Sequence, residues 1–242
     1  MIPDLHRRQI PLNIHLFRQK VSPDLRSLIV AIAEAGKDVE HAIRTIEPGR
    51  TGTTNFFGEK QLAIDVVSDN LIREHLKASH LVHSCVSEEQ TTSQLLDPRG
   101  LFTVSYDPLD GSSAVDALGS IFAVYERGDL PDCQLRDPLA VVHVVYGPRT
   151  VLVYYCGKSM HGFALNGAGE FVLLRENLTM RDEATNHAPG NLRAIIDRPA
   201  HKELMNIWLQ EDPTLRYSGA TAPDVYHVLV KGAGIFINVR GG

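Results

Sequence analysis

Apolar side chains recur every three or four positions in two stretches near the start of the chain. The first stretch follows Ser22-Pro23-Asp24, in which a Ser N-cap and a Pro at the first helical position are typical of a helix start. Its spacing predicts a helix from residue 22 to about residue 46, and the second stretch predicts a helix over residues 62–76. Residues 1–21 show little pattern, and we expect an arm or extension there.

Short apolar runs dominate the rest of the chain. Residues 81–86 and 101–106 predict two strands, and acidic residues follow each of them. Five β-rich runs separated by Gly, Pro and Asn predict an antiparallel meander, at 121–126, 139–146, 151–156, 162–166 and 171–175. The last quarter predicts alternating elements, namely strands at 191–196 and 235–239 and helices at 199–210 and 223–231. We therefore expect an α/β fold of layered helices and sheets, with halves at 1–180 and 181–242.

Residues 47–61 separate the two predicted helices and contain three glycines but few aliphatic side chains. This composition predicts a loop. A loop of this length is usually functional, and we expect it to act as a lid that orders when ligands bind.

Composition narrows the class of protein. Hydrophobic residues make up 43% and charged residues 22% of the 242 residues, which is ordinary for a globular enzyme. The net charge of −5 argues against nucleic-acid and membrane-surface partners. Cys85, Cys133 and Cys156 are sparse and have no metal-ligand spacing, and no apolar run resembles a signal peptide or membrane span. We expect a cytoplasmic location.

The two acidic strings carry the candidate chemistry. Ser87-Glu88-Glu89 follows the first predicted strand, and Asp107-Pro108-Leu109-Asp110-Gly111-Ser112-Ser113 follows the second, where Pro108 favours a turn. Carboxylates that hold hard cations beside backbone amides that hold phosphate oxygens suit metal-assisted hydrolysis of a phosphoester. A lone acidic pair would more often be solvated or cap a helix, but two strands that end in acids favour one shared metal site.

These strings resemble those of the class I fructose-1,6-bisphosphatases, within the lithium-sensitive, metal-dependent sugar phosphatase superfamily. The similarity extends from about residue 22 to 237 and includes Arg216-Tyr217-Ser218-Gly219 and the run from Gly232 to Phe236. The resemblance implies an αβαβα sandwich and hydrolysis of the 1-phosphate of fructose 1,6-bisphosphate by a homo-oligomer, a dimer or a tetramer. Alternatives are a sedoheptulose bisphosphatase, an inositol-phosphatase-like enzyme, or a catalytically impaired homologue that only binds sugar phosphates.

The resemblance also implies roles for individual acids. Glu88 and Asp107 would each bridge two Mg²⁺ ions, while Asp110 and the carbonyl of Leu109 would each bind one. Glu59 would complete a third metal site, and Mn²⁺ or Zn²⁺ could replace Mg²⁺. Glu89 and Asp65 would share a proton and act as the base, although an Asp near a helix start is usually a favourable dipole partner.

The remaining implied contacts are with the substrate. Gly111, Ser112 and Ser113 would hold the phosphate that is removed. Arg216 and Tyr217 would bind the other phosphate, with Arg216 reaching in from a neighbouring subunit, and Asn186 is either a further contact there or an exposed surface residue.

Three features depart from the family pattern. Ala114 stands where the family has Asn, and the stretches at 22–25 and 101–102 lack the residues of the family's AMP site. The sequence ends at Gly242, before the family's Tyr-Glu-x-Asn-Pro segment, so we expect a sandwich lacking its C-terminal elements and a chain that is a poor catalyst alone. His80, His83 and Cys85 have no fourth ligand at metal spacing, and we expect packing or surface roles for them.

Overall fold

The computed structural model describes residues 9–46, 49–54, 60–112, 117–128, 137–211 and 213–239. Its first elements are α1 (Leu12–Arg18), α2 (Pro23–Thr45), β1 (Arg50–Thr54), β2 (Lys60–Leu62), α3 (Ala63–Ala78), β3 (Val82–Ser87), β4 (Gln94–Leu95), β5 (Phe102–Asp110), β6 (Leu118–Glu126) and β7 (Ala140–Tyr146). They are followed by β8 (Val151–Tyr155), β9 (Met160–Leu165), β10 (Phe171–Leu178), β11 (Asn186–Gly190), the 3₁₀ turn η2 (Leu192–Ile195), α4 (Pro199–Glu211), β12 (Thr214–Leu215), α5 (Thr221–Lys231) and β13 (Gly234–Asn238).

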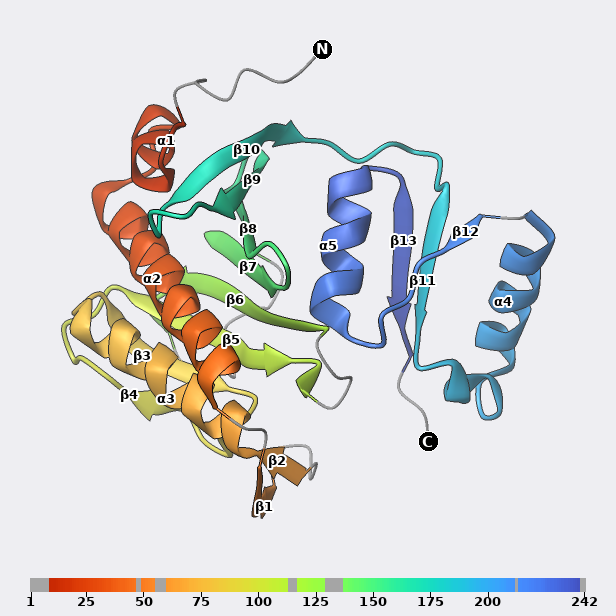
Figure 1. The fold of residues 1–242 in the computed structure, drawn as a ribbon, viewed down its shortest axis with the longest axis horizontal. Helices are drawn as coiled ribbons and strands as arrows, with labels where there is room; N and C mark the ends of the chain where they lie inside the picture. Colours follow the sequence, from red (N-terminus) through yellow and green to blue (C-terminus); the bar gives the residue numbers. More distant parts are fainter. Residues whose placement is uncertain are drawn as a thin grey trace.

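Five layers form the molecule (Figure 1). Helices α2 and α3 cover one face of an eight-stranded sheet with the order β10-β9-β8-β7-β6-β5-β3-β4. Helix α5 lies on the other face, between this sheet and a three-stranded sheet of order β12-β11-β13, and α4 lies outside the smaller sheet. This is the predicted αβαβα sandwich.

The core explains why the two long helices were predictable. The apolar stripe of α2 places Leu28, Ile29 and Ile32 against the sheet with no exposed area. Strands β6 to β10 form the predicted antiparallel meander, which β5 extends by pairing antiparallel with β6, while β3 runs parallel to β5. Among the described helices, none combines the length and apolar character needed to span a bilayer.

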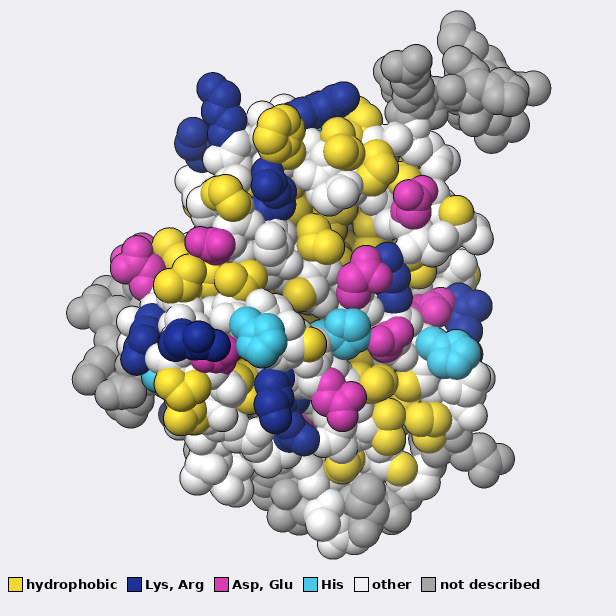
Figure 2. Space-filling model, turned by 90° about the vertical axis from the view of Figure 1, so that its left-hand side faces the viewer, with side chains coloured by type: hydrophobic (Ala, Val, Ile, Leu, Met, Phe, Trp, Pro, Cys, Tyr) yellow, Lys and Arg dark blue, Asp and Glu magenta, His cyan; other side chains and the backbone are white. Residues whose placement is uncertain are grey.

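Figure 2 shows the face that α1, α2 and α3 cover. Basic and acidic side chains are interspersed over it, and it shows no continuous basic surface. Interspersed charges of both signs are typical of a solvated surface rather than of a nucleic-acid footprint.

Two predictions for the N-terminal third were wrong. The expected arm contains α1, whose Leu12 and Leu16 are buried, and Pro11 forms a β-bridge with Val172 of β10. Helix α1 is only seven residues long, so its apolar spacing was too short to stand out. The expected loop at 47–61 contains the antiparallel pair β1–β2, and residues 47–48 and 55–59 lie outside the description.

The prediction of a strand at residues 191–196 was also wrong. The strand is β11, and Asn191, with a φ of 50°, ends it and starts the 3₁₀ turn η2. Strand β11 contains Pro189, although proline cannot donate to a sheet ladder and is rare inside strands. However, β12 pairs only with Asn186 and His187, so Pro189 lies beyond the part of β11 that is paired on both sides.

Close packing of α5 on β6 generates a prediction about stability. A Cβ on Gly119 would lie 2.4 Å from the Cβ of Ala222 and 2.7 Å from the carbonyl oxygen of Val144. Because the first contact can yield only if α5 moves and the second only if the backbone of β7 moves, we expect Gly119→Ala to lower the free energy of unfolding by about 1–3 kcal/mol. Urea unfolding measures this. Gly147→Ala is the control, since a Cβ there meets nothing within 4 Å, and equal stability of the two variants would contradict the packing argument.

Candidate active site

The two acidic strings meet because β3 and β5 are parallel neighbours. Ser87 at the end of β3 pairs with Tyr106 of β5, and the amide of Glu88 donates to the carbonyl oxygen of Tyr106 at 3.1 Å. This register brings the carboxyl groups of Glu88 and Asp107 together, and they are hydrogen-bonded to each other. Glu88 and Asp107 therefore lie at one site, as the shared metal site requires.

Asp107 and Asp110 do not lie on a turn, contrary to the prediction. Strand β5 continues to Asp110 and stays paired with β6, and the register shifts between Asp107, opposite Ile121, and Asp110, opposite Gly119. Such a β-bulge re-aims the side chains of a strand without ending it. Within it, the amide of buried Leu109 donates to Asp107 Oδ1 at 3.1 Å.

Asp110 is held by the N-terminus of α5. The amide of Ala222 donates to Asp110 Oδ2 at 2.6 Å, and the backbone of Thr221 also bonds to this carboxylate. Gly111 makes the approach possible: its φ is 87°, and a Cβ there would lie 2.1 Å from the carbonyl oxygen of Ala117. Only glycine adopts this backbone at low cost in so little space. The helix contact could not be read from a sequence spacing of 112 residues.

Asp65 and Glu89 are also brought together, at the start of α3. Asp65 Oδ2 accepts a hydrogen bond from the amide of Leu62 at 2.8 Å, which is the helix-start role that competes with catalysis. The side chain of Gln61 in β2 donates to the Glu89 carboxylate and also, at 3.2 Å, to the Glu89 carbonyl. The charge of Asp65 helps to raise the pKa of Glu89, so the two groups interact.

The clustered carboxyl groups hold protons more tightly than isolated acids. Burial, followed by the charges of Glu88 and Asp110, raises the pKa of Asp107 well above its ordinary range. Burial raises the pKa of Asp110 to about 6 against the lowering effect of the Ala222 amide. It also raises the pKa of Glu89 to about 7, and that of Asp65 above its usual value. A divalent cation would relieve this repulsion, and the oxygen-only donor set fits a hard cation.

The remaining predicted residues are scattered. Ser112 lies beside Asp65, whose pKa its hydroxyl lowers, whereas Ser113 and Glu59 lie outside the described residues. Asn186 is buried rather than exposed, and its amide donates to Thr185 Oγ1 and to the Ala233 carbonyl, so its described bonds are structural. Arg216 is exposed and donates to the carbonyl of Leu215 at 3.0 Å.

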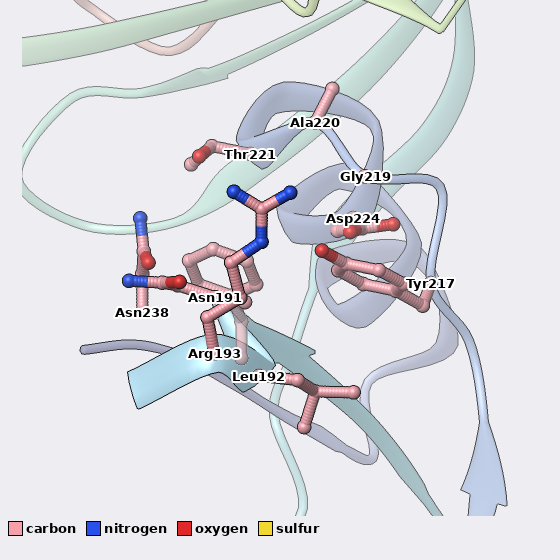
Figure 3. Close-up of a pocket in the computed structure, with 11 residues that line it drawn as sticks. Asn191, Leu192, Arg193, Tyr217, Gly219, Ala220, Thr221, Asp224 and Asn238 are labelled. Atoms are coloured by element: carbon pink, nitrogen blue, oxygen red, sulfur yellow. The ribbon is translucent and has the colours of Figure 1, made fainter. Parts of the chain in front are cut away.

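A cavity of about 570 Å³ adjoins the acidic cluster at the start of α5 (Figure 3). Tyr217 lines it, as do polar residues that the sequence analysis did not select, namely Asn191, Arg193, Thr221, Asp224 and Asn238. The guanidinium of Arg193 points into the cavity between Asn238 and Tyr217. The available signal was Asn191, because asparagine is among the few residues other than glycine that adopt a left-handed backbone, which ends a strand.

His80, His83 and Cys85 have the packing and surface roles predicted for them. His80 Nδ1 lies 3.1 Å from Asp97 Oδ2, and His83 Nδ1 lies 3.2 Å from the carbonyl oxygen of Asp97. Cys85 is buried in the core. These contacts tie β3 to the segment after β4 and leave no ligand set.

The five-layer sandwich, with acids at the ends of β3 and β5, is the fold of the metal-dependent sugar phosphatases. Residues 12–176 match the model of the fructose-1,6-bisphosphatase N-terminal domain. The class 1 fructose-1,6-bisphosphatase of Geobacter sulfurreducens is 42% identical over 240 residues, which cover 97% of this chain and 76% of the relative. The chain belongs to the class 1 fructose-1,6-bisphosphatase family, and this membership implies dependence on a divalent metal.

Other relatives agree on the fold. The chloroplastic sedoheptulose-1,7-bisphosphatase of Chlamydomonas reinhardtii is 39% identical over 90% of this chain and 57% of its own length. A Toxoplasma gondii structure provisionally named sedoheptulose-1,7 bisphosphatase has a TM-score of 0.84 and 30% identity, covering 96% of this chain and 78% of that one. Fructose-1,6-bisphosphatase of Leishmania major, 24% identical with a TM-score of 0.82 over 93% of this chain and 77% of that one, shows likeness of fold alone.

The raised pKa values generate a prediction about metal-free stability. An acid whose pKa is raised by folding keeps its proton after the unfolded chain has lost it, so stability falls as pH rises. For Asp110 and Glu89 this loss runs from about pH 4, the ordinary range of these acids, to their raised pKa values of about 6 and about 7, at no more than about 1.4 kcal/mol per pH unit for each group. Asp107 extends the loss to higher pH.

We expect Asp107→Asn to flatten this dependence and to make the metal-free protein more stable at pH 8 than the unaltered chain. Melting temperatures at pH 5 and pH 8 with a chelator present measure the effect. Asp182→Asn, at an exposed position, is the control and should change neither value. An equal loss of stability in the Asp107 variant and the unaltered chain would show that this carboxyl group is not under electrostatic strain.

Proposed function

We propose that this chain hydrolyses the 1-phosphate of fructose 1,6-bisphosphate, with divalent cations held by Glu88, Asp107 and Asp110. The convergence of Glu88 and Asp107 at the ends of two parallel strands carries the proposal, because it supplies an oxygen-only site in a protein of this family. Curated relatives of about 40% identity are named for this substrate. Sedoheptulose 1,7-bisphosphate is the second candidate, because a relative named for it is 39% identical.

Two or three Mg²⁺ ions, with Mn²⁺ or Zn²⁺ as substitutes, would polarise the phosphoryl group and neutralise the leaving oxygen. The chain's own residues provide the proton transfer and the positioning. Glu89, whose pKa is about 7, is matched to accept the proton of the attacking water near neutral pH, and Asp65 keeps this affinity high. The backbone at Gly111 and Ser112 lies beside these acids and would hold the phosphate that leaves. Roles for Leu109, Ser113 and Glu59 follow from the family resemblance alone.

The sugar and its second phosphate would occupy the cavity beside α5. Its volume of about 570 Å³ suits a small polar ligand, and the amide side chains of Asn191 and Asn238 can bond to hydroxyl groups. Arg193 makes no ion pair within the described part of the chain, so its guanidinium is available for a phosphate. Arg216, which is exposed, would serve a neighbouring copy in a homo-oligomer. The proposal assigns no substrate contact to Asn186, because its amide bonds to Thr185 and Ala233.

The proposal also covers the division of the chain into two halves and its cellular location. The metal and phosphate sites would occupy residues 1–180 and the sugar-binding half residues 181–242, in keeping with the family-model match to residues 12–176. A reducing compartment such as the cytoplasm suits the free cysteines Cys85 and Cys156.

The central test is phosphate release from fructose 1,6-bisphosphate, sedoheptulose 1,7-bisphosphate and inositol 1-phosphate during a Mg²⁺ titration. We expect metal-dependent turnover that is fastest with fructose 1,6-bisphosphate. We expect Glu88→Gln and Asp110→Asn to reduce kcat by more than about 100-fold, the upper limit for groups that only support a metal ligand. Glu126→Gln is the matched control at an exposed end of β6. Unchanged turnover in Glu88→Gln, or a large fall in melting temperature in both site variants, would refute the metal-ligand roles.

A second prediction addresses the cavity. Because Arg193 would make charge-assisted bonds to the distal phosphate, we expect Arg193→Gln to raise KM for the bisphosphate by about 10–100-fold, the equivalent of roughly 1.5–3 kcal/mol. The kcat should change much less. Arg127→Gln, an exposed arginine after β6, is the control. An unchanged KM would place the distal phosphate elsewhere.

A further inference from the structure

A second group of metal-ligand side chains lies away from the acidic cluster, where α1 meets the β9–β10 edge of the large sheet (Figure 1). His15 comes from α1, His161 from β9 and Glu176 from β10. One potential ligand atom of each lies within 4.8 Å of the other two. The phosphatase chemistry proposed above uses none of these residues.

The two imidazoles are buried, whereas the carboxylate reaches solvent. His15 and His161 are each 1% exposed, and their ring centroids lie 4.5 Å apart with an interplanar angle of 63°. His15 Nε2 lies 3.3 Å from Glu176 Oε1, and the Glu176 side chain is 51% exposed. The two imidazole rings are therefore held in place by burial, whereas the carboxylate of Glu176 is free to adjust its position.

Neighbouring polar groups orient both rings. Tyr154 Oη lies 2.9 Å from His15 Nδ1, which leaves Nε2 directed at Glu176. Ser159 Oγ lies 2.7 Å from His161 Nε2, and His161 Nδ1 accepts a bond from the amide of Asn177 at 3.2 Å. His161 Nδ1 is therefore unprotonated, and Ser159 receives the proton of Nε2. Metal-binding histidines are oriented in this way by an acceptor on the second nitrogen.

The backbone of β10 is irregular at this point. The register with β9 shifts between Arg175 and Leu178, so that β10 has one more residue than its partner there, and Asn177 has a φ of 54°. A left-handed backbone is uncommon in a residue other than glycine, and β-bulges are found where a strand must re-aim a side chain. The bulge turns Glu176 toward the two histidines.

We propose that His15 Nε2, His161 Nδ1 and Glu176 form a binding site for a transition-metal cation of the Zn²⁺ type. Two nitrogens and one carboxylate are a zinc donor set, whereas Mg²⁺ prefers oxygen ligands alone. For a cation to bind, the exposed side chain of Glu176 would move inward, and the cation would replace the hydrogen bond from the Asn177 amide to His161 Nδ1. Water would complete the coordination. Burial lowers the pKa of both histidines, which keeps them neutral and able to bind a cation. The cation would fasten α1 to β9 and β10.

The test uses the full chain with excess Mg²⁺, so that the oxygen-only site is occupied. Titration with Co²⁺ should give the absorption of a nitrogen-coordinated, tetrahedral ion. Zn²⁺ at one hundred times its Kd should raise the melting temperature by about 5–11 °C. We expect Glu176→Gln and His161→Asn to abolish both effects, and Glu88→Gln, which alters the other site, to retain them.

Glu183→Gln is the matched control at another exposed glutamate and should behave like the unaltered chain. Glu176→Gln removes a ligand from the surface and leaves the buried rings in place, so its loss of Co²⁺ absorption cannot be attributed to unfolding. The proposal is overturned if Glu176→Gln keeps the absorption and the rise in melting temperature, or if the unaltered chain shows neither. Loss of both effects in Glu88→Gln alone would assign the ion to the acidic cluster.

Discussion

The structure depends on holding several carboxyl groups together in a place where they cannot all carry charge without help. Parallel pairing of β3 with β5 places Glu88 beside Asp107, so that their carboxyl groups interact. The neighbouring acids each receive a donor, since Ala222 bonds to Asp110 and Leu62 bonds to Asp65. Asp107 receives the amide of Leu109, yet its carboxyl group remains buried beside that of Glu88, and a divalent cation would relieve the repulsion between the two.

Small residues let α5 serve both the acidic cluster and the cavity. Gly119 and Ala222 touch where the helix crosses β6, and any larger side chain would move the amide that holds Asp110. Buried His143 of β7 interacts with the backbone of Ala222 in the first turn of the same helix. Because Thr221 and Asp224 of this turn line the cavity, the packing that fixes the acid cluster also fixes the wall of the proposed sugar site.

Local chemistry made part of this arrangement predictable. Acids directly after two apolar runs indicated a shared site, and helical spacing with a Pro start indicated α2. The rest depends on distant partners. The bond from Ala222 to Asp110 joins residues far apart in sequence, and Pro189 was acceptable in β11 only because β12 ends early. Arg193, the cavity side chain proposed to bind phosphate, lies in a segment whose apolar residues favoured a strand, whereas the left-handed backbone of Asn191 ends the strand two residues earlier.

Gln61 connects the proposed lid region to the proton chemistry. It belongs to β2, within the segment predicted to cover the site, and its side chain donates to both the carboxylate and the carbonyl of Glu89. This bond lowers the pKa of Glu89, in opposition to burial and to the charge of Asp65. A displacement of β2 would remove the bond, raise the pKa of Glu89 further and leave more of it protonated near neutral pH. The position of the β1–β2 pair therefore sets how much of the proposed base is ready to accept a proton.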